Sequence, residues 1–322
     1  MVEMRRRPSP ASGRVGTSHA GVVPTPHRLV ADASGEQRSG PAANLITITD
    51  AGIGGYSMIG PDLSPLAVLE GKYQIVRPLG SGGMGEVFLA RDLALHRSVA
   101  VKVLRPGFAL LPEAAELFRR EARLGARLSH PGIVAIYAFG EASGTPYIVM
   151  QYLSGGSLGD RLRAQGALPP AMVRTVLAQL AAALGYAHGE GVVHRDIKPD
   201  NVFLTGPEDA PHPVLGDFGV AMRPMHDLGP RERRLRFGTP HFMSPEQAAG
   251  ELDLDGRSDL FSLGVLGYLM LTGGFPYDGP SEAAIAAARA REARVPLSEA
   301  APGAPADLVA AIERCQIGRA HV

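Results

Sequence analysis

The segment from His194 to Asn201 places three side chains suited to phosphoryl transfer within eight residues. Asp196 can accept the proton of an attacking hydroxyl. Lys198 can neutralise charge on a moving phosphoryl group, and Asn201 offers a neutral oxygen to a hard cation such as Mg²⁺. Strings of acid, base and amide also occur in ordinary polar loops, so the interpretation depends on what the rest of the chain supplies.

Three glycines, Gly80, Gly82 and Gly85, form the spacing G-x-G-x-x-G, which dinucleotide-binding proteins also use. A dinucleotide site needs a helix directly after the glycines, whereas Glu86 to Ala90 continues with the residues of a strand. A hairpin that covers phosphates therefore fits better than an oxidoreductase site. Without Cβ atoms, the glycines let backbone N–H groups approach phosphate oxygens closely.

Lys102 sits in a run of Val and Ala, where an unpaired ammonium group would be costly. It therefore requires an anionic partner. The triplet Asp217-Phe218-Gly219 follows another apolar segment, and its carboxylate is a candidate metal ligand.

Taken in order, these segments resemble the eukaryotic-like (Hanks-type) protein kinases, and bacterial Ser/Thr kinases most of all. The matching motifs are Leu79–Val87, Val99–Lys102, His194–Asn201, Asp217–Gly219 and Ser244–Glu246. The resemblance covers roughly Tyr73 to Cys315. It implies an α+β fold of two lobes, a small antiparallel sheet lobe with one helix and a larger, mainly α-helical lobe.

The resemblance also implies roles. Lys102 would hold the phosphates of ATP, Glu121 would anchor Lys102, and Asn201 and Asp217 would bind Mg²⁺. Asp196 would be the base. The catalytic set is completed by two residues typical of kinases that act on Ser or Thr, Lys198 and Thr239 of the substrate-docking loop. The nucleotide would be bound by the glycine-rich loop, the adenine walls and the hinge: Leu79, Gly80, Ser81, Gly82, Gly83, Gly85, Val87, Ala100, Met150, Gln151, Leu153 and Phe203.

Two further residues have structural roles by the same resemblance. Asp259, within an apolar helix, would accept hydrogen bonds from the backbone of the catalytic loop. His194 would pack against Phe218 rather than act as a base. A pseudokinase or scaffold that binds nucleotide or partners without chemistry is the alternative, although every ionisable group that transfer requires is present.

Composition divides the chain into four parts. Residues 1–68 are rich in Pro, Gly and Ser and are expected to be a disordered tail. Residues 69–153 should form the sheet lobe, with five antiparallel strands between Tyr73 and Tyr152 and one helix near Pro112 to Leu128. Residues 154–316 should form an incomplete helical lobe. Residues 317–322 resemble the translation of a sequencing adapter. Family kinases carry an Arg that pairs with Glu246 beyond this point, so we expect the chain as given to be poorly stable.

Charge and cysteine usage limit the partners. Thirty-two basic residues balance thirty-two acidic residues, so no net charge recruits nucleic acid or an anionic membrane. The single cysteine, Cys315, indicates a reducing compartment, and no apolar run is long enough for a membrane span, so we expect a cytoplasmic chain. Expected partners are ATP and proteins with Ser or Thr acceptors. A homodimer and a membrane anchor beyond residue 322 stay open.

In related kinases, Arg195 binds a phosphorylated Ser or Thr of the activation loop, yet residues 220–238 contain no Ser, Thr or Tyr. We therefore expect activity without loop phosphorylation, with Asp227 or Glu232 as the fixed anion for Arg195. Changing both acids to Ala should lower phosphate transfer from labelled ATP, whereas phosphatase treatment should not. Full activity of the double variant, or loss of activity after phosphatase, would contradict this expectation.

Overall fold

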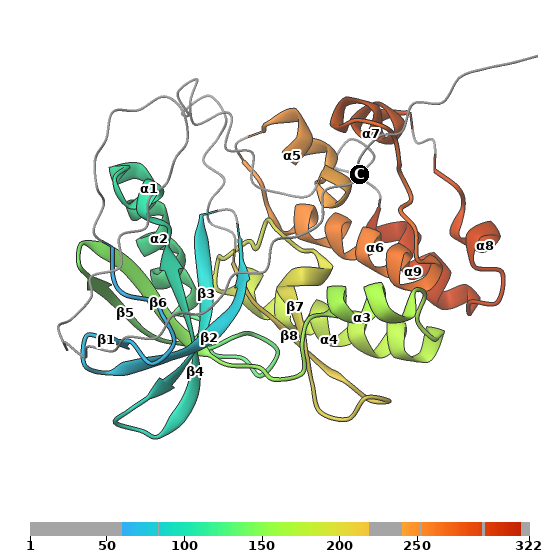
Figure 1. Cartoon of the computed structure of the whole chain (residues 1–322). Helices are drawn as coiled ribbons and strands as arrows, with labels where there is room; N and C mark the ends of the chain where they lie inside the picture. Colours follow the sequence, from blue (N-terminus) through green and yellow to red (C-terminus); the bar gives the residue numbers. More distant parts are fainter. Residues whose placement is uncertain (1–59, 83, 219–239, 252, 292–293, 317–322) are drawn as a thin grey trace, which may run out of the picture. The chain divides into compact units, whose positions relative to one another are not determined.

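The computed structural model describes residues 60–82, 84–218, 240–251, 253–291 and 294–316. The described residues form a sheet lobe followed by a larger helical lobe, as the sequence predicts (Figure 1). The expectations for residues 1–59, for the activation loop and for residues 317–322 lie outside the described residues.

The first lobe is one antiparallel sheet of six strands, namely the five expected between Tyr73 and Tyr152 and one more before them. The strands follow the order β1-β2-β3-β4-β6-β5, and their bounds are β1 (Val68–Leu69), β2 (Tyr73–Ser81), β3 (Gly85–Asp92), β4 (Arg97–Leu104), β5 (Ile136–Ala142) and β6 (Thr145–Gln151). The additional strand is β1, whose two residues are too few to show the alternation that predicts a strand. The lobe also holds two helices instead of one, because a single turn, α1 (Pro106–Ala109), precedes α2 (Pro112–Gly125).

The expected boundary of the tail is also wrong for its last residues. The N–H of Leu66 donates to the carbonyl of Ile75 at 2.8 Å, and the N–H of Ile75 donates to Ala67 at 2.8 Å. Leu63 packs against the apolar cluster of the sheet. These hydrogen bonds add residues before β1 to the edge of the sheet, so ordered structure begins before residue 69. The residues show no alternation of apolar and polar side chains that would predict this pairing.

The second lobe is built around α4 (Pro170–Gly189) and α6 (Gly256–Thr272). α6 is buried on almost every side, since Phe261, Leu266 and Met270 are all at most 1% exposed. The other helices are α3 (Leu158–Gln165), α5 (Pro245–Ala249), α7 (Glu282–Ala290), α8 (Leu297–Ala300) and α9 (Ala306–Cys315), with short 3₁₀ turns η1 (Pro199–Asn201) and η3 (Pro240–Phe242). None of the described helices is both long and apolar enough to cross a membrane.

A short hairpin joins the two halves of the predicted site. β7 (Val202–Thr205) begins directly after Asn201, and β8 (His212–Leu215) ends two residues before Asp217. Val202 is paired with Leu215, and the N–H of Gly216 donates to the carbonyl of Asn201 at 2.9 Å. The hairpin therefore brings two residues far apart in sequence to the same place.

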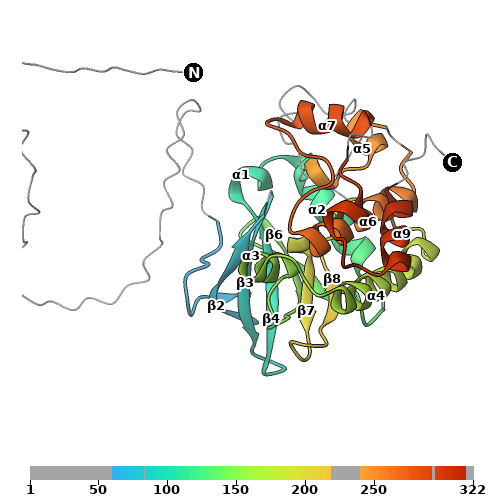
Figure 2. The same ribbon diagram turned by 90° about the vertical axis from the view of Figure 1, so that its right-hand side faces the viewer.

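Helix α9 lies against α6 in both views of the ribbon (Figures 1 and 2). The close approach depends on Gly264, where an added Cβ would lie 2.8 Å from the Cβ of Cys315 and 3.0 Å from the carbonyl oxygen of Ile312. Burial raises the pKa of the Cys315 thiol, in keeping with its packing against this glycine.

Gly264→Ala should therefore lower the melting temperature, because overpacking of this kind costs about 1 to 3 kcal/mol. Gly185→Ala is the matched control, since this exposed glycine of α4 has nothing within 4 Å of an added Cβ. The control should gain up to about 1 kcal/mol from helix propensity. Equal melting temperatures for the two variants would show that α9 does not pack on Gly264.

Candidate active site

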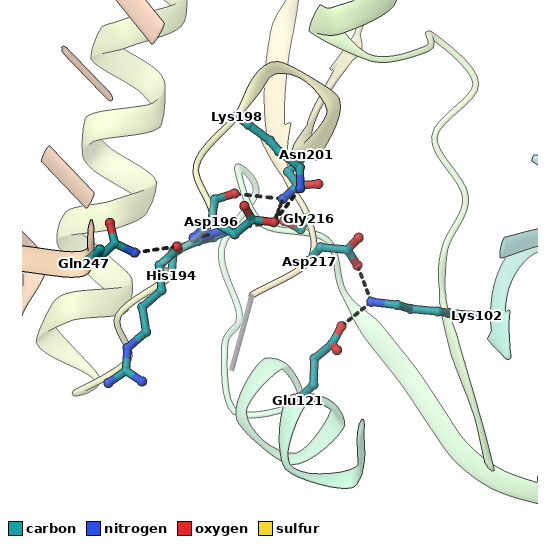
Figure 3. A network of polar contacts seen from close by, with 10 residues as sticks. Lys102, Glu121, His194, Asp196, Lys198, Asn201, Gly216, Asp217 and Gln247 are labelled. Carbon is teal, nitrogen blue, oxygen red and sulfur yellow. Dashed lines mark hydrogen bonds and ion pairs between the residues drawn. The ribbon is translucent and has the colours of Figure 1, made fainter. Parts of the chain in front are cut away.

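The carboxylate of Asp196 is held by two neighbours in the catalytic loop. Its Oδ2 accepts hydrogen bonds from Nζ of Lys198 at 2.7 Å and from Nδ2 of Asn201 at 2.9 Å (Figure 3). Nδ2 of Asn201 also donates to the backbone carbonyl of Asp196 at 2.8 Å. These bonds leave Oδ1 of Asp196 as the oxygen that can take a proton.

His194 is fully buried and joins the loop to the end of β8. Its Nδ1 accepts from the N–H of Asp196 at 3.2 Å, which leaves Nε2 to donate to the carbonyl of Gly216 at 2.9 Å. The ring lies 4.6 Å from that of Phe218. The predicted packing of His194 on Phe218 is present. Both ring nitrogens form hydrogen bonds, so the ring fixes the distance between the catalytic loop and the end of β8.

Asp259, on α6, binds the backbone of the catalytic loop. Its side chain is fully buried, and its two oxygens accept from the N–H of His194 at 2.8 Å and of Arg195 at 2.7 Å. The predicted contact with the loop backbone is therefore observed. A third donor was not predicted: Nε2 of His188 lies 2.7 Å from Oδ2 of Asp259.

Arg195 has a positive φ of 69°, a conformation that non-glycine residues rarely adopt. Its carbonyl accepts a hydrogen bond from Nε2 of Gln247 at 2.8 Å (Figure 3). Gln247 was not singled out from the sequence. It is the third residue of α5 and also closes the capping box with Ser244, so one side chain links the start of α5 to the catalytic loop.

Lys102, on β4, reaches between two carboxylates. Its Nζ donates to Oε1 of Glu121 on α2 at 2.6 Å and to Oδ1 of Asp217 at 2.9 Å (Figure 3). Burial disfavours the ammonium, yet the charges of Asp217 and Glu121 raise its pKa well above the ordinary value. The anionic partner that the sequence requires is therefore present twice.

The pKa values of the two acids are shifted in opposite directions. Burial raises the pKa of Glu121 despite the attraction of Lys102. At Asp217 burial acts in the same direction, but Lys102 outweighs it and the pKa is lowered. Like Arg195, Asp217 is in the left-handed region of the backbone, with a φ of 53°.

Asn201 and Asp217 fit a magnesium site. The amide nitrogen of Asn201 is turned toward Asp196, so Oδ1 is available to a cation, and Lys102 uses Oδ1 of Asp217 but not Oδ2. Within the part of the chain that the structure describes, no three His, Cys, Asp or Glu side chains form a metal cluster. Two oxygen donors completed by phosphate and water are typical of Mg²⁺ and not of a cage made of protein alone.

The glycine-rich segment forms the β2–β3 hairpin, as predicted. Gly80 is paired with Val87, Ser81 with Glu86, and the N–H of Gly82 donates to the carbonyl of Gly85 at 2.9 Å. Leu79 is exposed on the same hairpin. Gly83 and Thr239 lie outside the described residues, so their predicted roles stay predictions.

The expected adenine walls come from three elements. Val87 on β3 is paired with Lys102, and Ala100 on β4 with Met150 on β6, so both lie on the sheet beside the lysine. Phe203, on β7, packs its ring against Gly216, where an added Cβ would lie 2.8 Å from Cε2. This places Phe203 next to Asp217, and its contact with adenine stays a prediction.

The hinge residues Gln151 and Leu153 keep their expected roles as predictions. The N–H of Gln151 donates to the carbonyl of Ala135 at 2.9 Å, so a nucleotide would have to use other backbone groups of this segment. Its side-chain oxygen is turned toward the N–H of Ala135 as well, at 3.4 Å. Leu153 is half-buried just beyond β6, and Met150 lines a small cavity of about 20 Å³ behind the hinge with Glu121 and Phe218.

The chain matches the family model described as the protein kinase domain over residues 73–307. It therefore belongs to the protein kinase domain family. It is 42% identical to the Serine/threonine-protein kinase pkn2 of Myxococcus xanthus, over 76% of this chain and 29% of the relative. It is also 42% identical to PknB of Mycobacterium tuberculosis, over 76% of this chain and 39% of that protein.

Solved structures agree with this assignment. A crystal structure of the PknI kinase domain of Mycobacterium tuberculosis is 30% identical, with a TM-score of 0.61, over 80% of this chain and 91% of that chain.

PrkC of Bacillus subtilis is 39% identical, over 68% of this chain and 33% of the relative. The resemblance to bacterial Ser/Thr kinases is thus confirmed, while the chain spans only about a third of the length of these curated relatives.

Lys102→Met should destabilise the protein, because it leaves Glu121 and Asp217 facing each other without a cation. At pH 7 we expect a loss of up to about 3 kcal/mol, below the range for a fully buried pair because Asp217 is 40% exposed. Glu121 has a raised pKa, and a raised carboxyl pKa favours the folded state as pH falls. The deficit in melting temperature should therefore shrink between pH 7.5 and pH 5.

Lys72→Met is the control, since Lys72 is 64% exposed and lies 3.8 Å from Glu70. It should leave the melting temperature almost unchanged at both pH values. A deficit in Lys102→Met that stays constant with pH would show that charge repulsion is not its cause.

Proposed function

We propose that this chain is a serine/threonine protein kinase domain, which transfers the γ-phosphate of Mg²⁺-bound ATP to Ser or Thr hydroxyls of proteins. The observation that carries the proposal is the geometry around Asp196. One carboxylate oxygen is fixed by Lys198 and Asn201, and the other is left to accept a proton. Relatives named as serine/threonine-protein kinases support the same activity.

Each residue has a defined task in this reaction. Asp196 orients the acceptor hydroxyl and takes its proton at Oδ1. Lys198, whose Nζ donates to Oδ2 of Asp196, neutralises negative charge on the phosphoryl group as it is transferred. Lys102, fixed by Glu121, binds the phosphates of ATP. The arrangement supplies positioning and charge neutralisation, which are the main contributions to phosphoryl transfer.

Asn201 and Asp217 would hold the metal. When bound there, Mg²⁺ would neutralise charge on the phosphates of ATP. The residues that hold it are themselves fixed, Asn201 by Asp196 and Asp217 by Lys102. Since the hairpin β7–β8 joins them, the spacing between the two metal ligands is set by backbone pairing.

The relatives extend beyond the part that this chain matches, so the protein substrates and the activating signal are not defined by the domain. We expect bacterial signalling as the context, by similarity to the relatives. The single cysteine is consistent with a cytoplasmic location of the domain, where ATP is available.

Asp196→Asn should reduce turnover by about 10² to 10⁴, the range for loss of a positioned acid–base group, while ATP binding stays nearly intact. Transfer from labelled ATP to myelin basic protein measures the first quantity, and calorimetric titration with Mg²⁺ and ATP measures the second. Asp209→Asn, an exposed acid in the turn between β7 and β8, is the control and should retain full turnover. A wild-type domain that binds ATP and never transfers phosphate would support the pseudokinase alternative instead.

A further inference from the structure

Three consecutive backbone carbonyls in η3 each accept a hydrogen bond from a side chain of another helix. Nη2 of Arg289, on α7, donates to the carbonyl of Pro240 at 2.8 Å and to that of His241 at 3.3 Å. Oγ of Ser262, on α6, donates to the carbonyl of Phe242 at 2.7 Å. The turn is therefore held along its whole length by two helices of the second lobe.

The guanidinium of Arg289 lies in an unusual environment for a cation. The residue is 5% exposed, and its Cζ lies 5.6 Å from the ring centre of Phe261 and 5.9 Å from that of Tyr277. No carboxylate forms an ion pair with it among the described residues, and its Nε is buried without a hydrogen-bond partner. Two aromatic rings and two carbonyls are what compensate the buried charge.

This arrangement is not explained by stability alone. A buried charge without a carboxylate costs free energy, and an apolar side chain of similar volume is often as stable or more stable at such a position. Burial lowers the pKa of Arg289, which reflects the same cost. A side chain that is costly in the folded state, and that fixes the backbone of one turn, is better explained by the geometry that it enforces.

The turn that Arg289 holds follows the substrate-docking loop directly. Pro240, the first residue of η3, comes directly after Thr239, which the resemblance places in the docking loop. Downstream, Phe242 is buried in the core and Ser244 caps the start of α5. Gln247 of α5 donates to the carbonyl of Arg195, beside the catalytic Asp196.

We propose that Arg289 is a positioning residue for protein substrates, which holds the end of the docking loop at a fixed distance from the catalytic loop. The inference rests on the proposed kinase function. It assigns to α7 a role in acceptor binding that is separate from nucleotide binding, because the hydrogen bonds of Arg289 go to Pro240 and His241 of η3.

Kinetics with two substrates test the proposal in the full chain. In Arg289→Met, which fills the space between the rings but donates no hydrogen bond, the KM for myelin basic protein should rise about tenfold, as expected for roughly one lost hydrogen bond from a charged group. The KM for ATP and the melting temperature should stay near the wild-type values. Arg289→Lys should recover part of the loss, since it restores the charge but not the planar donor.

Arg291→Met is the matched control, because Arg291 is exposed two residues further along the chain. It should leave both KM values unchanged. An unchanged KM for the protein acceptor in Arg289→Met overturns the proposal. So does a fall in melting temperature with both KM values shifted together, which would mean that Arg289 only maintains the core.

Amide hydrogen exchange separates this proposal from the proposed function. In Arg289→Met the amides of residues 241–244 should exchange faster than in wild type, whereas Arg291→Met should not change them. If exchange is unchanged in Arg289→Met, Arg289 does not hold η3, and the proposal is overturned whether or not the domain transfers phosphate. If the wild-type domain never transfers phosphate, although exchange shows that Arg289 holds η3, the proposed function would be rejected instead.

Discussion

The buried carboxylate of Asp259 is the interaction on which the site depends most directly. A carboxylate with no exposure is tolerated only when donors surround it, and here the N–H groups of His194 and Arg195 and the ring of His188 do so. Two of these donors are backbone groups, so satisfying the charge also fixes the path of the catalytic loop. Asp196 follows immediately in the chain. Its orientation therefore depends on the hydrogen bonds by which the loop backbone satisfies the buried carboxylate of Asp259.

The same fixed path explains why two residues of the site adopt a backbone conformation that L-residues avoid. Arg195 and Asp217 both have positive φ, at 69° and 53°. Such conformations cost of order 1 to 3 kcal/mol each and persist where surrounding contacts outweigh that cost. Arg195 is held by Asp259 and Gln247 on either side of its peptide unit, and Asp217 by Lys102. The strain therefore sits where the chain turns to present a functional side chain.

The sequence predicts the parts of this site that are local in the chain. The strand after the glycines, the apolar run around Lys102 and the order of the motifs define the fold class and the main ion pair. Three contacts between distant segments, those of Lys102, His194 and Asp259, were implied by the resemblance because these residues lie in recognisable motifs. The contacts that were missed involve residues outside the motifs: His188 with Asp259, Gln247 with Arg195, and Arg289 with Pro240. Each residue taken alone is an ordinary polar side chain on a helix, so only the tertiary arrangement shows its partner.

The strand that the sequence does not predict was missed for a different reason. β1 is defined by its pairing with β2, since its own two residues are too few to show a pattern. Backbone hydrogen bonds are common to all residue types, so the sequence carries little information about which of them are used.

Buried polar atoms without partners show where the structure gives up stability for geometry. Among the described residues there are four: Arg195 Nε, Glu246 Oε2, Arg289 Nε and Gln179 Oε1. Three of them lie on the catalytic loop, on α5 or against η3, and Glu246 has its other oxygen bound by Ser258 at 2.7 Å. Native proteins satisfy nearly all such groups, and exceptions gather at functional sites. The unpaired oxygen of Glu246 is the acceptor that the resemblance assigns to an Arg, so Arg195 and Arg289 are the groups that indicate stability given up for the geometry of the catalytic loop and of η3.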